Sequence, residues 1–295
     1  MGKFTRILAA AAAAALLVGG VVLLTKDEAA QKIVDRKMAD FQPSASMMDT
    51  LDILTEELKN TETTPVLTIA EEEMTGTTED IPVQETAPYI PSDTLPVEVM
   101  DELTAQAEAL QAAYPNAIGW LYLPDTGINY PIMQGDDNDF YLHHAPDGRS
   151  LKAGSVFLDF RCEQRFMNPV NLVYAHNMNN GTMFAGITRF TDSAYFSSHR
   201  YGWLATSETV FRIDFFSAAV VGRYDVLYDG SAEISSWLSH LAEVSKMYEN
   251  ANISGDTRFI SLSTCSYEFK DARTVLIGRR TAAGDRCLLH FVQAA

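Results

Sequence analysis

The chain has 295 residues, of which 47% are hydrophobic, and this is enough material for one or two folded domains. Its formal net charge of −17 argues against nucleic acid as a partner, because such binding needs a basic surface. The acidity is concentrated in residues 27–102, which hold 19 acidic and 4 basic side chains. Residues 103–295 hold 20 acidic and 15 basic side chains, a balance that is typical of a globular surface.

Residues 1–26 predict a membrane segment. Lys3 and Arg6 precede an uncharged apolar run from Ile7 to Leu24. As a helix this run spans about 27 Å, close to the thickness of a bilayer core. A cleaved signal peptide is the alternative, but its apolar core is usually shorter, at about 7–15 residues. We therefore expect a single-pass signal anchor in the cell membrane, with a cytoplasmic N-terminus and the rest of the chain outside.

Residues 27–97 have the composition of an acidic spacer. Apolar residues recur at three- and four-residue steps over Ser46–Lys59, which predicts an amphipathic helix, and a weaker helical pattern covers Gln31–Phe41. Residues 60–97 are rich in Thr, Glu and Pro and cannot bury enough apolar surface to offset the entropy of ordering. We predict that residues 27–97 form a flexible acidic stalk, followed by a folded domain over residues 98–295.

That domain is predicted to be mainly β. Helical spacing covers Pro96–Tyr114, after which the apolar period changes to two, and it returns once, at Ala232–Asn250. The expected strands are separated by Gly, Asn, Asp and Pro clusters and cover residues 117–123, 128–133, 155–160, 171–175, 209–221, 258–264, 274–280 and 287–293. This number of short strands favours a small closed barrel or a sandwich.

Three chemically capable side chains lie at the ends of predicted strands. His176 follows the strand NLVYA, Cys265 follows RFISLST, and Arg273 begins the next strand after a seven-residue loop. If the last two strands form an antiparallel hairpin, Cys265 and Arg273 lie at the same end of neighbours about 4.8 Å apart. Spacing alone does not bring His176 to them, and each residue type is more often structural at such a position.

Together these three side chains suit covalent acyl transfer. A thiolate is a nucleophile whose formation nearby cations favour, and an imidazole exchanges protons near neutral pH. A guanidinium stays protonated, so it cannot be the base, but it can stabilise an oxyanion. The three cysteines are too few for a disulfide framework, and free thiols at Cys162 and Cys287 are favoured over a disulfide between them.

The segments around these residues resemble the sortases, membrane-anchored cysteine transpeptidases of Gram-positive bacteria. The segment SLSTC at 261–265, followed by Arg273, is similar to the TLxTC…R signature of the family, with Ser261 in place of the first Thr. Residues 172–190 are similar to the strand and loop that carry the sortase histidine, and residues 116–161 resemble the start of the class B catalytic domain. The resemblance implies a closed eight-stranded sortase-type β-barrel with N-terminal helices and a long helix between strands 6 and 7.

The resemblance also implies a reaction. Cys265, His176 and Arg273 would cleave an NPxTx-type C-terminal sorting signal of a secreted protein after its Thr, through a thioacyl-enzyme. The acyl group would pass to an amine of a lipid-linked peptidoglycan precursor or of a pilin, with no cofactor and no metal. Substrate contacts are expected at Ser261, Ser263, Thr264, Ser266, Tyr224, Leu227 and Tyr228. The alternatives are another exported Cys/His cell-wall acyltransferase or peptidase, and a non-catalytic surface-binding module.

Overall fold

The computed structural model describes residues 26–62, 95–249, 251 and 253–283. The apolar run that predicts the anchor, residues 63–94 of the predicted stalk and the predicted strand 287–293 lie outside the described residues. Among the helices in the described ranges, none combines the length and the apolar character needed to cross a bilayer.

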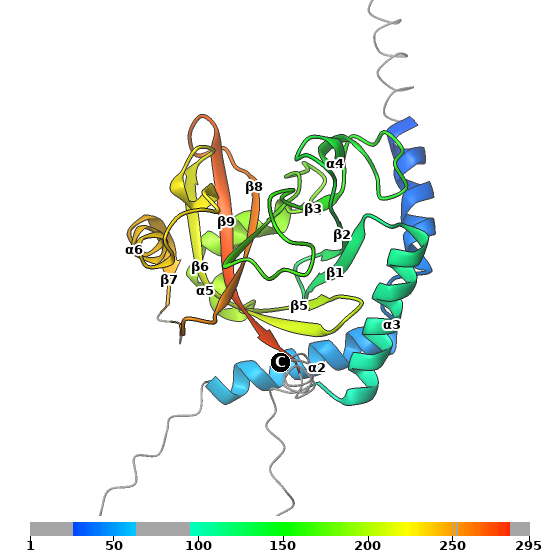
Figure 1. Cartoon of the computed structure of the whole chain (residues 1–295), viewed down its shortest axis with the longest axis horizontal. Helices are drawn as coiled ribbons and strands as arrows, with labels where there is room; N and C mark the ends of the chain where they lie inside the picture. Colours follow the sequence, from blue (N-terminus) through cyan, green and yellow to red (C-terminus); the bar gives the residue numbers. More distant parts are fainter. Residues whose placement is uncertain (1–25, 63–94, 250, 252, 284–295) are drawn as a thin grey trace, which may run out of the picture.

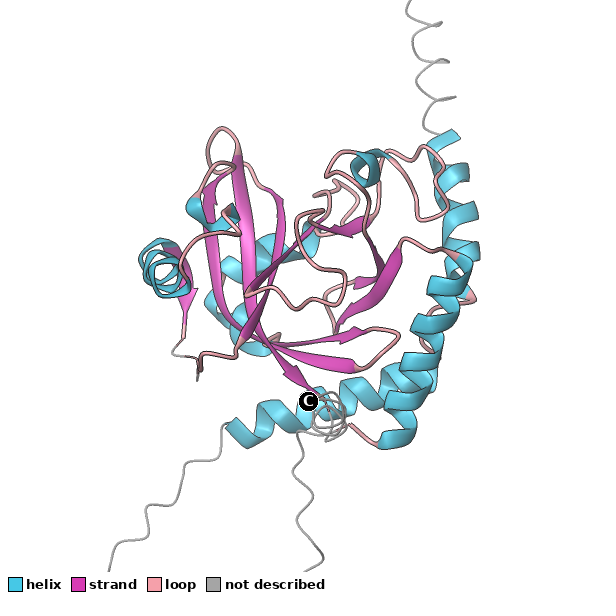
Figure 2. Cartoon of the chain, in the orientation of Figure 1, coloured by secondary structure: helices cyan, strands magenta, loops and turns pink. Residues whose placement is uncertain are grey.

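The centre of the molecule is a barrel of short strands with helices on its outside (Figures 1 and 2). Eight strands follow the order β5-β1-β2-β3-β4-β8-β9-β6, and the pairing of β5 with β6 closes the ring. The ninth, β7, pairs with the other half of β6. The strands are β1 (Ala117–Leu123), β2 (Ile128–Met133), β3 (Val156–Leu158), β4 (Val170–Tyr174), β5 (Tyr201–Ala205), β6 (Val210–Gly222), β7 (Ser245–Tyr248), β8 (Arg258–Cys265) and β9 (Ala272–Ala282). The predicted closed eight-stranded barrel is confirmed.

Helices precede the barrel and connect its strands. Residues 26–39 are helical, and the remaining helices and 3-10 turns are α2 (Ala45–Glu62), α3 (Val97–Ala113), α4 (Phe140–His143), η1 (Ala185–Thr191), α5 (Ser193–Ser198), η2 (Val226–Tyr228) and α6 (Ile234–Val244). The resemblance implied a helix between strands 6 and 7, and α6 occupies this place.

The helices of residues 26–62 pack on the barrel, although their composition assigned them to the spacer (Figure 1). Leu51 of α2 is 1% exposed, and burial of this kind stabilises a fold by about 1.5–3 kcal/mol per leucine. The Tyr122 hydroxyl donates a hydrogen bond of 2.5 Å to Asp52. Because α2 and α3 share one core with the barrel, residues 63–94 connect two helices of the same domain and do not separate the domain from the N-terminus.

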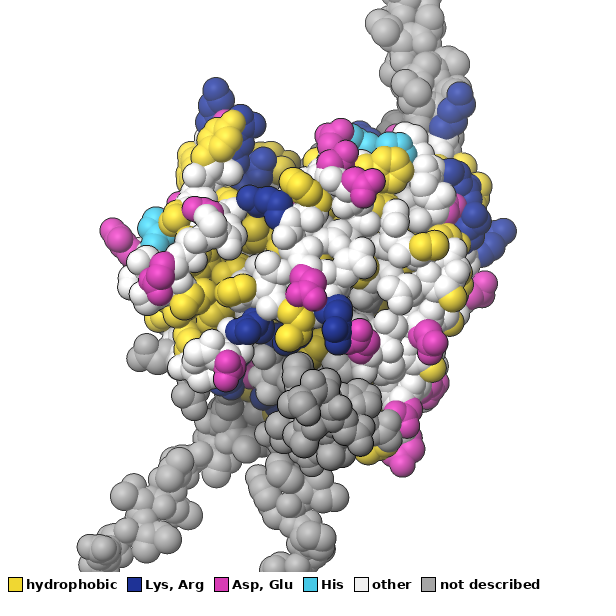
Figure 3. All heavy atoms as spheres, viewed as in Figure 1, with side chains coloured by type: hydrophobic (Ala, Val, Ile, Leu, Met, Phe, Trp, Pro, Cys, Tyr) yellow, Lys and Arg dark blue, Asp and Glu magenta, His cyan; other side chains and the backbone are white. Residues whose placement is uncertain are grey.

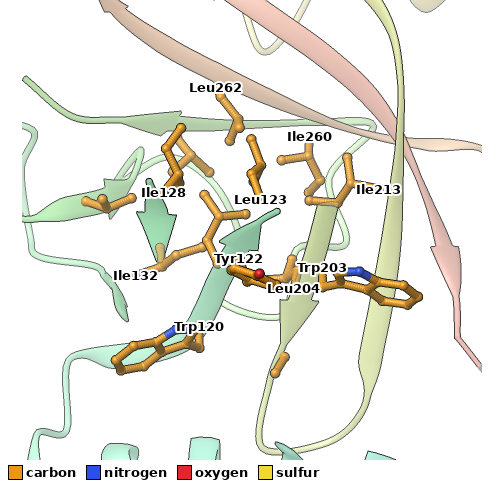
Figure 4. Packing of buried hydrophobic residues seen from close by; sticks show 14 of the residues in the cluster. Trp120, Tyr122, Leu123, Ile128, Ile132, Trp203, Leu204, Ile213, Ile260 and Leu262 are labelled. Atoms are coloured by element: carbon orange, nitrogen blue, oxygen red, sulfur yellow. The ribbon is translucent and has the colours of Figure 1, made fainter. Parts of the chain in front are cut away.

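The barrel interior is filled by large apolar side chains from facing strands, among them Leu123, Ile128, Ile132, Leu204, Ile213, Ile260 and Leu262 (Figure 4). Trp120, Tyr122 and Trp203 alternate with these and are buried on the outer face of the barrel, where the Tyr122 hydroxyl and Trp203 Nε1 donate hydrogen bonds to Asp52 and Thr55 of α2. A second cluster lies between the outer barrel face and α6, where the Trp237 and Phe259 ring centroids are 5.6 Å apart. The amphipathic helix predicted over Ser46–Lys59 is confirmed by α2.

Two strands were not predicted, and one helix ends earlier than its pattern indicated. All five residues of β5 are buried, so this strand lacks the alternation that marks a half-exposed strand. The helix predicted to continue to Asn250 ends at Val244, and the next four residues form β7. The free edge of β6 offers backbone partners to these residues, and ladder formation there replaces the last helical turns.

Candidate active site

The register of three strands brings the candidate residues to one end of the barrel. β8 and β9 are antiparallel, with Cys265 directly opposite Arg273, as expected for a hairpin. β4 and β8 are parallel, and Tyr174 pairs with Ser263. His176, two residues beyond Tyr174, therefore lies level with Cys265.

These three residues border one cleft with a volume of about 630 Å³. One wall consists of the ends of β4, β8 and β9. The opposite wall is the segment from Arg223 to Asp229, which contains η2 and is called the loop wall below. Residues from α4 and from the segment that follows β3 complete the lining. A cleft of this size can hold several residues of an extended peptide.

The Cys265 thiol is half-buried and unpaired, and the Cys265 carbonyl accepts a hydrogen bond of 2.8 Å from Asn177 Nδ2. Arg273 is also half-buried, and its Nη1 donates to the Ala272 carbonyl at 2.9 Å. A guanidinium placed opposite a thiol on the neighbouring strand can stabilise negative charge that develops on an atom bonded to that sulfur.

The imidazole of His176 is oriented by a main-chain group. Its Nε2–H donates a hydrogen bond of 2.8 Å to the carbonyl of Leu142, in α4. In the neutral ring the proton is therefore on Nε2, and Nδ1 is the nitrogen that can take up another. The His143 ring centroid is 6.3 Å from that of His176, so a second imidazole lies beside the first.

Four of the predicted substrate contacts line the cleft: Ser263, Thr264, Tyr224 and Tyr228. The hydroxyls of Tyr228 and Ser263 share a hydrogen bond of 2.8 Å that joins the two walls. Burial raises the pKa of Tyr228 to about 12, so this hydroxyl keeps its proton at neutral pH. Thr264 Oγ1 donates to the Ala175 carbonyl at 2.9 Å and is satisfied within the protein, whereas Tyr224 is 83% exposed.

The other three predicted contacts, Ser261, Ser266 and Leu227, are not among the residues that line the cleft. Ser261 is fully buried, although strand alternation places it on the same face as Ser263. Leu227 is 1% exposed and packs in the cluster around Trp237. The cleft is thus confined to the last residues of β8, a limit that alternation does not reveal.

Arg161 lines the cleft but was not predicted. It donates to Asp159 at 2.9 and 2.8 Å and to the Tyr228 carbonyl at 3.2 Å, which joins β3 to the loop wall. Burial acts to raise the pKa of Asp159, but hydrogen bonds from Arg161 and Asn138 outweigh it and hold this pKa below its usual range. Arg161 directly follows a predicted strand, so the signal that singled out His176 was present here too.

The described part of the chain was also expected to hold no metal site. No group of three or more His, Cys, Asp and Glu side chains there could hold a metal ion. Cys162 is a free thiol, and Cys287 lies outside the described residues.

No protein-family model matches the chain. A curated Sortase B from Listeria monocytogenes is 31% identical over 188 residues, which cover 62% of this chain and 75% of that protein. The chain belongs to the class B sortases. A Sortase B from Staphylococcus aureus is 24% identical to this sortase over 185 residues, which cover 61% of this chain and 76% of that protein.

Solved structures agree with this assignment. A Streptococcus pyogenes class B sortase involved in pilus biogenesis has a TM-score of 0.56 and 28% identity, covering 59% of this chain and 97% of its own. Clostridium perfringens sortase B has a TM-score of 0.55 and 27% identity, covering 59% and 98%. The resemblance read from the motifs is confirmed, and this sortase is a cysteine transpeptidase.

Proposed function

We propose that the cleft binds a C-terminal sorting signal of NPxTx type and that Cys265, His176 and Arg273 cleave it after its Thr. The observation that carries the proposal is the strand register, which sets Cys265 opposite Arg273 and level with His176 beside one cleft. The size of the cleft and its position between two walls suit an extended peptide.

The first half of the reaction is acylation. The Cys265 thiolate attacks the Thr carbonyl carbon and forms a C–S bond, and Arg273 donates hydrogen bonds to the resulting oxyanion. Protonated His176 gives its proton to the departing amine as the C–N bond breaks. The N-terminal part of the substrate remains on the enzyme as a thioester.

The second half transfers the acyl group. A primary amine of a lipid-linked peptidoglycan precursor or of a pilin lysine attacks the thioester carbonyl. The amine loses a proton to neutral His176, the new C–N bond forms and the C–S bond breaks. Cys265 leaves as the thiolate and His176 is again protonated, so the cycle closes without a cofactor. Surface anchoring and pilus assembly both use this chemistry.

We place the peptide between Ser263 and Thr264 on the strand side and Tyr224 and Tyr228 on the loop wall. The strand side offers main-chain groups of β8 whose positions relative to Cys265 are fixed by the strand. The loop wall offers two aromatic side chains, one exposed and one hydrogen-bonded to Ser263. Residues of this kind suit recognition of alternate side chains of an extended peptide.

We infer that residues 1–26 anchor the protein in the cell membrane with the N-terminus in the cytoplasm. The support is the apolar run after Lys3 and Arg6. The helix over the described residues 26–39 follows that run closely in the sequence. An anchor at residues 1–26 therefore places the catalytic domain close to the outer membrane surface, where lipid-linked amines and exported proteins meet.

The test is intact mass spectrometry of the full chain in detergent micelles, mixed separately with NPxTx-type and LPxTx-type peptides. Hydroxylamine is added in parallel to trap the thioester, and Cys265→Ala is the control. The expected result is a thioacyl adduct and a hydroxamate product with the NPxTx peptide and the wild-type thiol alone. Absence of both products with either peptide, in protein whose Cys265 still reacts with iodoacetamide, contradicts the proposed reaction.

A further inference from the structure

The backbone pairing of β4 with β8 ends just before the candidate catalytic residues. The last register pair is Tyr174 with Ser263, and Ala175 N donates to the Ser263 carbonyl at 3.3 Å. His176 and Cys265 lie beyond this point. The strand ladder therefore does not by itself fix the distance between their main chains.

Two side-chain hydrogen bonds continue the connection past the end of the ladder. Thr264 Oγ1 donates to the Ala175 carbonyl at 2.9 Å, from β8 toward β4. Asn177 Nδ2 donates to the Cys265 carbonyl at 2.8 Å, in the opposite direction. The second bond joins the residue that follows His176 to the main chain of Cys265, so it spans the two catalytic positions directly.

The main chain around Asn177 is fixed by backbone hydrogen bonds. Asn177 forms an isolated antiparallel bridge with Met183, and Phe184 N donates to the His176 carbonyl at 2.9 Å. Met183 N donates in turn to the Tyr130 hydroxyl at 3.0 Å. The amide of Asn177 thus projects from a fixed loop, and its bond to Cys265 transmits that fixed position to the nucleophile.

We propose that Asn177 is a positioning residue that holds the main chain of Cys265 level with His176. This inference rests on the proposed roles of Cys265 and His176. Proton transfer and nucleophilic attack depend steeply on geometry, and a displacement of about 1 Å can cost about a hundredfold in rate. Loss of the Asn177 amide frees the Cys265 carbonyl and with it the direction of the thiol.

Asn171 offers a matched control on the same pair of strands. Its Nδ2 donates to the Asn168 carbonyl at 2.9 Å and to the Phe259 carbonyl at 3.1 Å, near the start of β8. The bond to Phe259 is the same amide-to-carbonyl link between β4 and β8, at the end far from the cleft. Asn171 is fully buried and Asn177 half-buried, so a purely structural role predicts at least as large an effect at Asn171.

The experiment uses the full chain in micelles with the variants Asn177→Ala, Asn177→Asp and Asn171→Ala. Steady-state kinetics with the sorting peptide give kcat and KM. Without peptide, the iodoacetamide reaction rate of Cys265 is measured across about pH 5 to 9 by peptide mapping. Cys162 is the internal reference for an intact fold, because burial raises the pKa of its thiol and slows its reaction.

For Asn177→Ala we expect kcat to fall by about tenfold to a hundredfold. KM should stay within about twofold, because the lost contact acts on the reacting groups. The pH profile of Cys265 alkylation in Asn177→Ala should shift toward higher pH. In Asn177→Asp the shift toward higher pH should be larger, since a carboxylate cannot donate to the Cys265 carbonyl and repels a thiolate. Asn171→Ala should lower the melting temperature and leave both readouts of the folded protein unchanged.

Two results overturn the inference. One is a wild-type kcat and alkylation profile in Asn177→Ala; the other is an equal change in both readouts in Asn171→Ala. A wild-type enzyme that is alkylated at Cys265 but processes neither sorting peptide contradicts the proposed function instead. In that event the alkylation profiles of the variants still decide the role of Asn177.

Discussion

The two walls of the cleft are built in different ways. On the strand side, Cys265 and Arg273 are the last partners of a continuous antiparallel ladder, which sets these two residues opposite each other. The loop wall consists of a short irregular segment in which Tyr224 is 83% and Val226 40% exposed. At the rim of the cleft, Figure 3 shows basic and hydrophobic side chains gathered over the tips of β8 and β9.

Side-chain contacts hold the loop wall in place. Arg161 donates to the Tyr228 carbonyl, the hydroxyls of Tyr228 and Ser263 share a hydrogen bond, and His240 Nε2 lies 3.0 Å from Asp225. The difference between the walls separates two tasks. In the proposed reaction, Cys265 and Arg273 are set opposite each other by backbone pairing, whereas the proposed substrate contacts Tyr224 and Tyr228 are carried on a loop held by side chains.

The largest effect is expected on the strand wall, for Arg273→Ala. Loss of the guanidinium opposite Cys265 removes the proposed donor to the oxyanion, and kcat should fall by about 10²- to 10³-fold. Arg273→Lys keeps the charge but not the planar donor geometry, so it should recover only part of the activity. Steady-state peptide cleavage measures both. Full activity in Arg273→Ala would favour a Cys/His acyltransferase mechanism that needs no guanidinium.

A smaller effect is expected where the loop wall is tied to β3, for Arg161→Ala. The carboxylate of Asp159 is fully buried and would lose its charged partner, which should lower the free energy of unfolding by about 1–3 kcal/mol. Chemical denaturation followed by circular dichroism measures this loss. The value of KM should rise as well, because Arg161 no longer holds the Tyr228 carbonyl.

The same variant makes a prediction about acid stability. In the wild type the pKa of Asp159 is lowered, so its stabilisation is present above about pH 4 and is lost as pH falls through the folded-state pKa. Without Arg161, burial raises this pKa, and acid unfolding should begin at a higher pH. Arg165→Ala, which breaks an exposed pair with Glu208, is the control and should leave the acid midpoint in place. Identical acid midpoints for all three proteins would argue against the Arg161 link.

The smallest effect is expected for Tyr228→Phe. The change keeps the aromatic ring and removes the one hydroxyl that bonds Ser263 across the cleft. A lost hydrogen bond of about 1 kcal/mol corresponds to about a fivefold rise in KM, with kcat little changed. Tyr248→Phe, on β7 and away from the cleft, is the control. A loss confined to kcat would show that the loop wall takes part in chemistry. It would contradict the assignment of catalysis to the strand side and substrate contacts to the loop wall.

The local elements and part of the site can be predicted from the amino-acid sequence alone. The period of two gave the segments of most barrel strands, and the period of three to four gave α2 and α3. The seven-residue loop between Cys265 and Arg273 was sufficient to place these two residues opposite each other, because a hairpin is a local structure. Two residues separated by a short loop can meet without any contact from a distant part of the chain.

The remaining features of the site depend on contacts between distant parts of the chain. His176 reaches Cys265 through the parallel pairing of β4 with β8, whose residues are nearly ninety positions apart in sequence. Arg161 meets the loop wall through a hydrogen bond to the Tyr228 carbonyl, which is also distant in sequence. The helix α2 belongs to the domain because Leu51 packs in the same apolar core as the barrel. A periodic pattern states which face of a segment is apolar. Which distant surface covers that face is set by burial and backbone pairing across the whole chain.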